Sequence, residues 1–100
     1  MDQISPAAPA GEPGIAGTDE LLRQVLAEVL GLPAERVAQF DLDTGLFGHL
    51  PELDSMAVAG LLTEIEDRLE IVIEDDEVGG EMLETYGALL AFAEAKRQGR

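Results

Sequence analysis

The sequence of 100 residues contains no cysteine. This absence excludes disulfide bonds, a thiolate nucleophile and a zinc site built on thiolates. The sequence also has no apolar run of membrane-spanning length, and its N-terminus lacks the basic and then apolar layout of a signal peptide. We therefore expect a cytoplasmic protein that does not enter a membrane.

Basic residues are scarce, because six Lys and Arg stand against 21 Asp and Glu, for a formal net charge of −15. A surface with this charge repels nucleic acid and anionic membranes, and it attracts basic patches on other proteins. We therefore expect no nucleic-acid partner and no membrane partner, but a basic protein partner.

The chain length is sufficient for one domain with one modest core. Residues 1–17 hold three prolines and three glycines and few apolar side chains. Such a segment cannot bury enough apolar surface to fold, so it is predicted to be a disordered N-terminal tail. The folded domain is predicted to cover residues 18–98.

Three segments place apolar residues at the one-face spacing of an amphipathic helix: about 19–30, 55–69 and 82–97. Thr18 or Asp19 is the expected cap of the first helix. Residues 33–37 can form a short helical turn, and residues 74–78 a short third helix. The loop between the first two long helices is long, and residues 71–73 read as a buried connector. We predict an all-α four-helix bundle of three longer helices and one short one.

Serine is also scarce, and only Ser55 lies outside the predicted tail. It follows Asp54 where the second long helix is expected to begin. One interpretation is that Asp54 or Ser55 caps the helix. The other is that Ser55 is an attachment point, because a helix N-terminus favours a bound phosphate and the acidic helix that follows suits docking of basic partners.

Two other chemical interpretations are weaker. His49, the only histidine, can serve as a general base for Ser55, but nothing in the sequence supplies an oxyanion site. Asp41, Asp43 and Glu52 have calcium-loop spacing, but Leu46 occupies the position that needs glycine for a sharp turn. We therefore expect neither an enzyme nor a metal site, and a divalent-ion sensor stays as a minor alternative.

The motif Asp54-Ser55-Met56, the acidic helix after it, the stretch 73–77 and Phe47, eight residues before the serine, together resemble an acyl carrier protein. The resemblance covers residues 19–97. It implies covalent 4'-phosphopantetheine on Ser55, with Asp54 and Met56 flanking the attachment point and Phe47 anchoring the long loop.

Details of the motif differ from those of fatty-acid carriers, which usually have Leu-Gly-x-Asp-Ser, whereas this sequence reads LPELDS at residues 50–55. Leu-Asp-Ser-Met is similar to the motif of D-alanyl carrier proteins. The longer strings LPELDSMAV and DDEVGGEMLETYGALLAFAEAKR look closer to the stand-alone carriers encoded beside exosortase and exopolysaccharide genes. This resemblance implies a dedicated pathway.

The implied function is to hold an acyl or aminoacyl group as a thioester and to present it to partner enzymes. A phosphopantetheinyl transferase would attach the arm, an acyl-loading ligase or acyltransferase would load it, and a downstream enzyme would accept the acyl group. We expect the chain to be a monomer. The alternative is an acidic helical interaction module that binds a basic protein and is never modified. The expected partner-binding residues are Glu64, Glu66, Asp67 and Glu70.

Overall fold

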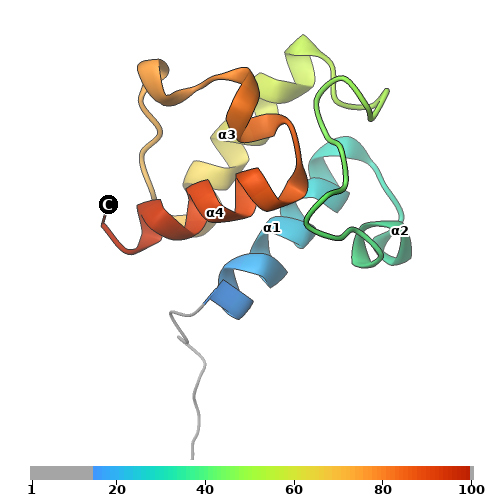
Figure 1. Ribbon diagram of the computed structural model, residues 1–100, viewed down its shortest axis with the longest axis horizontal. Coiled ribbons are helices and arrows are strands. Elements are labelled where there is room, and N and C mark those ends of the chain that lie inside the picture. Colours follow the sequence, from blue (N-terminus) through green and yellow to red (C-terminus); the bar gives the residue numbers. More distant parts are fainter. Residues whose placement is uncertain (1–14, 100) are drawn as a thin grey trace, which may run out of the picture.

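The computed structural model describes residues 15–99, which fold into helices joined by loops (Figure 1). The α-helices are α1 (Ile15–Leu30), α2 (Ala34–Ala38), α3 (Ser55–Leu69) and α4 (Tyr86–Arg97). Two 3-10 helices, η2 (Asp75–Glu77) and η3 (Gly80–Leu83), lie between α3 and α4. The predicted all-α fold is confirmed, although the short α-helix is α2 and the expected third helix is a single 3-10 turn.

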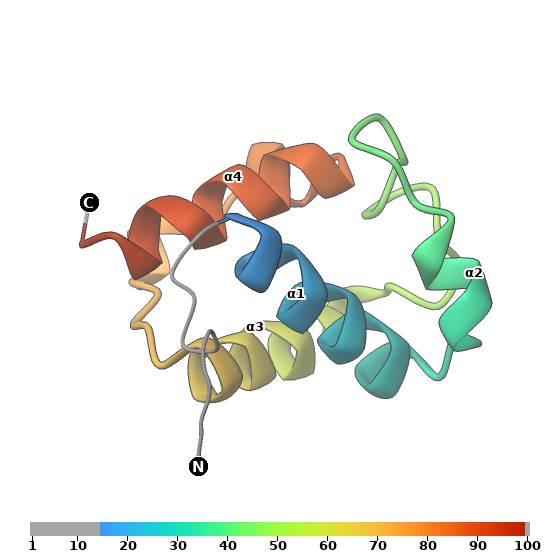
Figure 2. The same cartoon turned by 90° about the horizontal axis from the view of Figure 1, so that it is seen from below.

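Helix α1 is the centre of the domain. It packs against α3, α2 and α4, and Figure 2 shows it running between α3 and α4, with α2 beyond its C-terminal half. The three long helices contribute apolar stripes that meet in one core, as their 3.6-residue periodicity requires. The long-helix residues with no exposed surface include Leu22, Val25, Leu26, Leu61, Ile65, Tyr86 and Leu89.

The start of α1 differs from the sequence prediction. The helix begins at Ile15, so residues 15–17 belong to it and not to the tail, and residues 1–14 lie outside the described part. Thr18 does not cap the helix, because it is the fourth residue of α1, and its side chain is fully buried. Its hydroxyl donates to the carboxylate of Glu94 in α4 and accepts from Arg97. With this packing against α4, α1 begins about one turn earlier than expected.

The start of α4 also differs, because the helix begins at Tyr86 and not near Met82. Thr85 is the cap, and its hydroxyl accepts from the N–H of Ala88 at 3.1 Å. The first two N–H groups of the helix donate to loop carbonyls, Tyr86 to Thr44 at 2.8 Å and Gly87 to Leu42 at 2.9 Å. Backbone bonding to the loop therefore separates η3 from α4.

The long loop between α2 and α3 is fixed to the η3–α4 junction. The N–H groups of Leu46 and Phe47 donate to the carbonyls of Glu84 and Leu83, each at 2.9 Å. The buried anchor is Leu46, with no exposed surface, whereas Phe47 is 42% exposed. The predicted anchor is therefore displaced by one residue. Held in this way, the loop leads directly into the start of α3.

Candidate functional site: the start of α3

The cap of α3 is Asp54. Its backbone is extended, and its carboxylate accepts the N–H of Ala57 at 2.8 Å. Ser55 is then the first helical residue, and it is exposed. Its hydroxyl makes no hydrogen bond with any residue in the described range 15–99. The two interpretations of the motif are therefore separated, since Asp54 does the capping and Ser55 presents a hydroxyl to solvent.

The backbone around Ser55 favours an anion. The first backbone hydrogen bond of the helix runs from the N–H of Val58 to the carbonyl of Asp54 at 2.9 Å, and the side-chain carboxylate of Asp54 accepts the N–H of Ala57. The N–H groups of Ser55 and Met56 have no acceptor within residues 15–99. Free N–H groups and the positive end of a 15-residue helix stabilise a phosphate placed beside them.

Ser55 borders two hollows on the surface. One has a volume of about 450 Å³ and is formed by the loop from Phe47 to Leu53 together with Asp54. The other, of about 490 Å³, lies between α3 and the chain from Ile73 to Val78. A group attached to Ser55 therefore has space on both sides of the attachment point.

The second hollow has mainly apolar walls and carboxylates at its rim. Its apolar wall residues include Val58, Leu62, Ile73 and Val78, while Glu66 and Asp75 contribute the carboxylates. The connector at 71–73 is only partly buried, because Val72 is 65% exposed. The connector, which was expected to be buried, therefore lines the hollow through Ile73 and exposes Val72 to solvent.

Two contacts hold the chain that covers this hollow. The N–H of Ile73 donates to Glu66 at 2.7 Å, which ties the connector to α3. Lys96 of α4 donates to both carboxylate oxygens of Glu77, at 2.9 and 3.0 Å. The backbone N–H of Glu74 and then Lys96 lower the pKa of the Glu77 carboxyl below its usual value. The carboxylate at this corner is therefore stabilised in its charged form.

The four acidic residues predicted to bind partners do not share one role. Asp67 and Glu70 are exposed and make no ion pair within residues 15–99. Glu64 pairs with Arg68 at 3.0 Å, and Glu66 is the acceptor for Ile73. Two of the four carboxylates thus make contacts within the domain, and the role of all four in partner binding stays a prediction.

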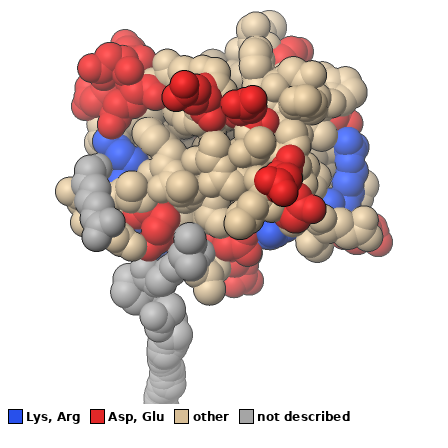
Figure 3. All heavy atoms as spheres, in the orientation of Figure 1, with Lys and Arg blue, Asp and Glu red and all other residues tan. Residues whose placement is uncertain are grey.

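Additional carboxylates lie over η2, at the upper left of Figure 3. Glu74, Asp75 and Asp76 are exposed there, and Asp75 also lines the second hollow beside Ser55. The run EDDE is visible in the sequence, but its position next to Ser55 depends on how the connector folds back along α3. These three residues enlarge the acidic surface around the site.

The other candidate residues of the loop are engaged elsewhere. The ring of His49 packs against Gly45, where an added Cβ would lie 2.4 Å from its Cγ, and it makes no hydrogen bond to Ser55. Asp41 accepts from the N–H of Asp43 and the hydroxyl of Thr44, while Glu52 pairs with Arg36 at 3.1 Å. Within residues 15–99, no group of three or more acidic or His side chains is placed to hold a metal ion.

Residues 20–93 match the model of the phosphopantetheine attachment site family. The chain belongs to this family. The fold is also similar to the solution structure of a holo acyl carrier protein from Nitrosomonas europaea, with a TM-score of 0.73, 38% sequence identity and coverage of 80% of this chain and 95% of that one. No curated protein sequence matches the chain.

Family membership supports the predicted type of protein. The chain is a carrier and not an enzyme, and its cofactor is covalently attached 4'-phosphopantetheine. The residues at the start of α3 fit such a group, because they combine an exposed hydroxyl, two free N–H groups and space on both sides. No helix of the described range is long and apolar enough to cross a membrane.

Proposed function

We propose that Ser55 carries the phosphopantetheine arm and that the arm holds an acyl or aminoacyl group as a thioester for enzymes of a dedicated pathway. The observation that carries this proposal is the free hydroxyl of Ser55 at the start of α3. The only other serine, Ser5, lies outside the described residues.

The remaining hydroxyl groups of residues 15–99 are all engaged. Thr18 bonds to Glu94, and Thr85 caps α4. Thr44 donates to Asp41, and Thr63 donates to the carbonyl of Ala59 at 3.0 Å. The phenol of Tyr86 is bonded to Asp19 and buried. Ser55 is therefore the hydroxyl of this range that is both accessible and unbonded.

In the attachment step, the Ser55 oxygen forms a bond to the phosphorus of coenzyme A that bears the pantetheine. The bond from that phosphorus to the adenosine bisphosphate breaks, and the hydroxyl proton passes to the transferase. The N–H groups of Ser55 and Met56 then face the new phosphodiester, while Asp54 keeps the helix start ordered. Once attached, the group supplies the thiol that the cysteine-free chain lacks.

The surroundings of Ser55 support the partner classes expected from the sequence. The exposed carboxylates over η2, and Asp67 and Glu70 near the C-terminal end of α3, attract basic patches on a phosphopantetheinyl transferase, a loading ligase or acyltransferase and an acyl-accepting enzyme. The hollow between α3 and η2 offers apolar walls to an acyl chain and carboxylates to an amino group. The similarity to carriers encoded beside exosortase and exopolysaccharide genes supports a dedicated pathway, served by a cytoplasmic monomer.

The decisive experiment is to measure intact mass after incubation with coenzyme A and a broad-specificity phosphopantetheinyl transferase. Wild type and Ser5→Ala should each gain one phosphopantetheine, and Ser55→Ala should gain none. Modification of Ser55→Ala would refute the assignment. If wild type gained no mass with several transferases, the unmodified acidic interaction module would become the better explanation.

A second experiment tests the docking surface. Asp67→Lys combined with Glu70→Lys should slow modification about tenfold at low salt, because charge steering of the transferase is lost. Glu35→Lys combined with Glu84→Lys makes the same charge change at exposed positions away from α3, so it should have a much smaller effect. Equal slowing by both pairs would show that only the net charge matters.

A further inference from the structure

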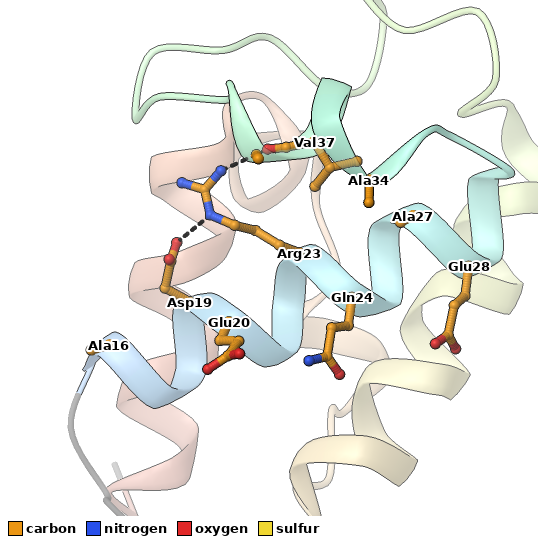
Figure 4. Close-up of a pocket in the computed structure, with 10 residues that line it drawn as sticks. Ala16, Asp19, Glu20, Arg23, Gln24, Ala27, Glu28, Ala34 and Val37 are labelled. Carbon is orange, nitrogen blue, oxygen red and sulfur yellow. Dashed lines mark hydrogen bonds and ion pairs between the residues drawn. The ribbon is translucent and has the colours of Figure 1, made fainter.

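A groove of about 640 Å³ lies between α1 and α2 (Figure 4). It is lined by side chains of α1 from Ala16 to Glu28 and of α2 from Ala34 to Ala38. None of these residues lines either hollow beside Ser55. A partner seated in the groove would therefore leave the attachment point accessible.

The single basic side chain among the lining residues of this groove is Arg23, and its guanidinium makes several contacts within the domain. Its Nε pairs with Asp19 at 2.9 Å, and its other nitrogens donate to the carbonyls of Val37 at 2.6 Å and Phe40 at 3.0 Å. Its guanidinium also lies 4.7 Å from the ring centre of Tyr86. Arg23 thus joins α1 to α2 and leaves no free positive charge for an anionic ligand.

The carboxylates of the groove set the charge that an occupant must have. Glu20 is exposed and makes no ion pair within the described residues, and Glu28 is exposed near the other end, where Arg68 contacts it. They are eight residues apart on α1, which corresponds to about 12 Å along the helix axis. Because Glu28 is already paired with Arg68, an occupant with a positive charge near Glu20 would complement the groove.

The apolar part of the groove lining consists of small side chains, namely Ala16, Ala27, Ala34, Val37 and Ala38, and the Arg23 side chain crosses from α1 to α2 among them. Small side chains let the backbone of another helix approach closely. From Ala16 to Glu28 the groove follows α1 for about 18 Å, or a little over three helical turns. This elongated shape matches an amphipathic helix better than a compact small molecule.

We propose that the α1–α2 groove binds a basic amphipathic helix of a partner protein. The apolar face of that helix packs on the small apolar side chains of the groove, and a Lys or Arg side chain lies near Glu20. A second copy of this chain is a poor occupant because it carries a net charge of −15. The chain's own residues 1–14 are no better, since they contain Asp2 and Glu12 and no Lys or Arg.

Such binding would hold the carrier on a partner through α1 and α2 while other enzymes reach Ser55. It is independent of the attachment proposal, because the groove and the attachment point have no lining residue in common. The two proposals can therefore fail separately.

The test is an NMR titration of the full-length protein with a synthetic helical peptide of about 14 residues made of Ala, Leu and Lys. Its leucines follow helical one-face spacing. A control peptide has the same composition with the leucines spread around the helix. We expect the first peptide to shift amide signals of α1 and α2, and the control peptide to bind at least several-fold more weakly.

Variants then separate the groove from the general negative charge. Glu20→Lys should raise the dissociation constant about fivefold to tenfold, more than the matched exposed change Glu84→Lys. Ala38→Trp should block the groove, whereas Ala91→Trp on exposed α4 surface should not. Ser55→Ala should bind like wild type. The proposal is overturned if the signals shift mainly on α3, or if the groove variants weaken binding no more than their matched controls.

Discussion

The carboxylate of Asp54 lies 2.8 Å from the backbone nitrogen of Ala57 and accepts its hydrogen bond. This contact caps the start of α3, and the neighbouring Ser55 hydroxyl makes no hydrogen bond to any of residues 15–99. Helix capping and group attachment need the same kind of residue at the same end of a helix. In this chain Asp54 caps the helix and the proposed attachment point is the next residue, Ser55, so each can be changed without the other.

Asp54→Ala should lower the free energy of unfolding by about 1 kcal/mol, because the cap is lost. Asp54→Asn should retain most of that stability, since an amide oxygen also accepts the Ala57 N–H. Ser55→Ala should stay within about 0.5 kcal/mol of wild type, as expected for an exposed side chain with no hydrogen-bond partner among residues 15–99. Urea unfolding of the three variants measures these differences. A larger loss for Ser55→Ala than for Asp54→Ala would contradict this division of roles.

The long helices were predictable because their apolar periodicity is local, as in the stripe that includes Leu22 and Leu26. The start of α1 was not, because it depends on a contact between Thr18 and Glu94, 76 residues apart. The start of α4 was missed for a related reason. The apolar pattern continues through Met82 and Leu83, and the Thr85 cap together with the loop carbonyls that bond the first turn separates the two segments.

The candidate attachment motif Asp54-Ser55-Met56 consists of neighbouring residues, so the sequence alone suggests it, and the assignment of the arm to Ser55 stays a prediction. The contacts that each acidic residue makes could not be predicted from the sequence. In the sequence Glu66 and Asp67 are two neighbouring acidic residues with no visible difference in role. In the structure the Glu66 carboxylate accepts the N–H of Ile73, whereas Asp67 is exposed. Which carboxylates meet a partner is therefore decided by the path of the connector after α3.

Two helical glycines should respond to alanine in opposite directions. Gly60→Ala should stabilise the protein by about 0.5–1 kcal/mol, because alanine favours a helix interior and a Cβ there meets open space. Gly87→Ala should destabilise it by about 1–3 kcal/mol. Its Cβ would lie 2.7 Å from the carbonyl oxygen of Leu42, which also accepts the Gly87 N–H. Thermal or urea unfolding checks both signs, and a stabilising Gly87→Ala would show that the loop does not pack on α4 this way.

The contact between Glu77 and Lys96 should make stability sensitive to acid. The N–H of Glu74 and then Lys96 lower the pKa of Glu77 below its ordinary value of 4.5, so the folded state favours the carboxylate. This contribution is present above the unfolded pKa of the carboxyl and is lost as the pH falls through the lower folded pKa. Lys96→Met removes part of the shift.

The measurement is the free energy of unfolding at neutral pH and at a pH well below 4.5, where part of this contribution should be lost. The difference between the two conditions should be smaller in Lys96→Met than in wild type. The matched variant Arg36→Met removes the partner of Glu52, whose pKa is lowered first by a backbone hydrogen bond and then by Arg36. It should also reduce the acid sensitivity. An unchanged difference in Lys96→Met would show that the pair does not contribute.

Added salt should stabilise the protein, although salt weakens its exposed ion pairs. Six basic residues cannot neutralise 21 carboxylates, and three of the four consecutive carboxylates at 74–77 have no cationic partner within residues 15–99. Repulsion among these charges acts in the folded state and is screened within about 10 Å at 0.1 M salt. Each kcal/mol of repulsion removed by sodium chloride should raise the melting temperature by about 4–8 °C.

Asp75→Asn combined with Asp76→Asn should reduce this gain, because part of the repulsion is then already absent. A melting temperature that fell with salt would mean that the ion pairs of Arg68 and Lys96 outweigh the repulsion.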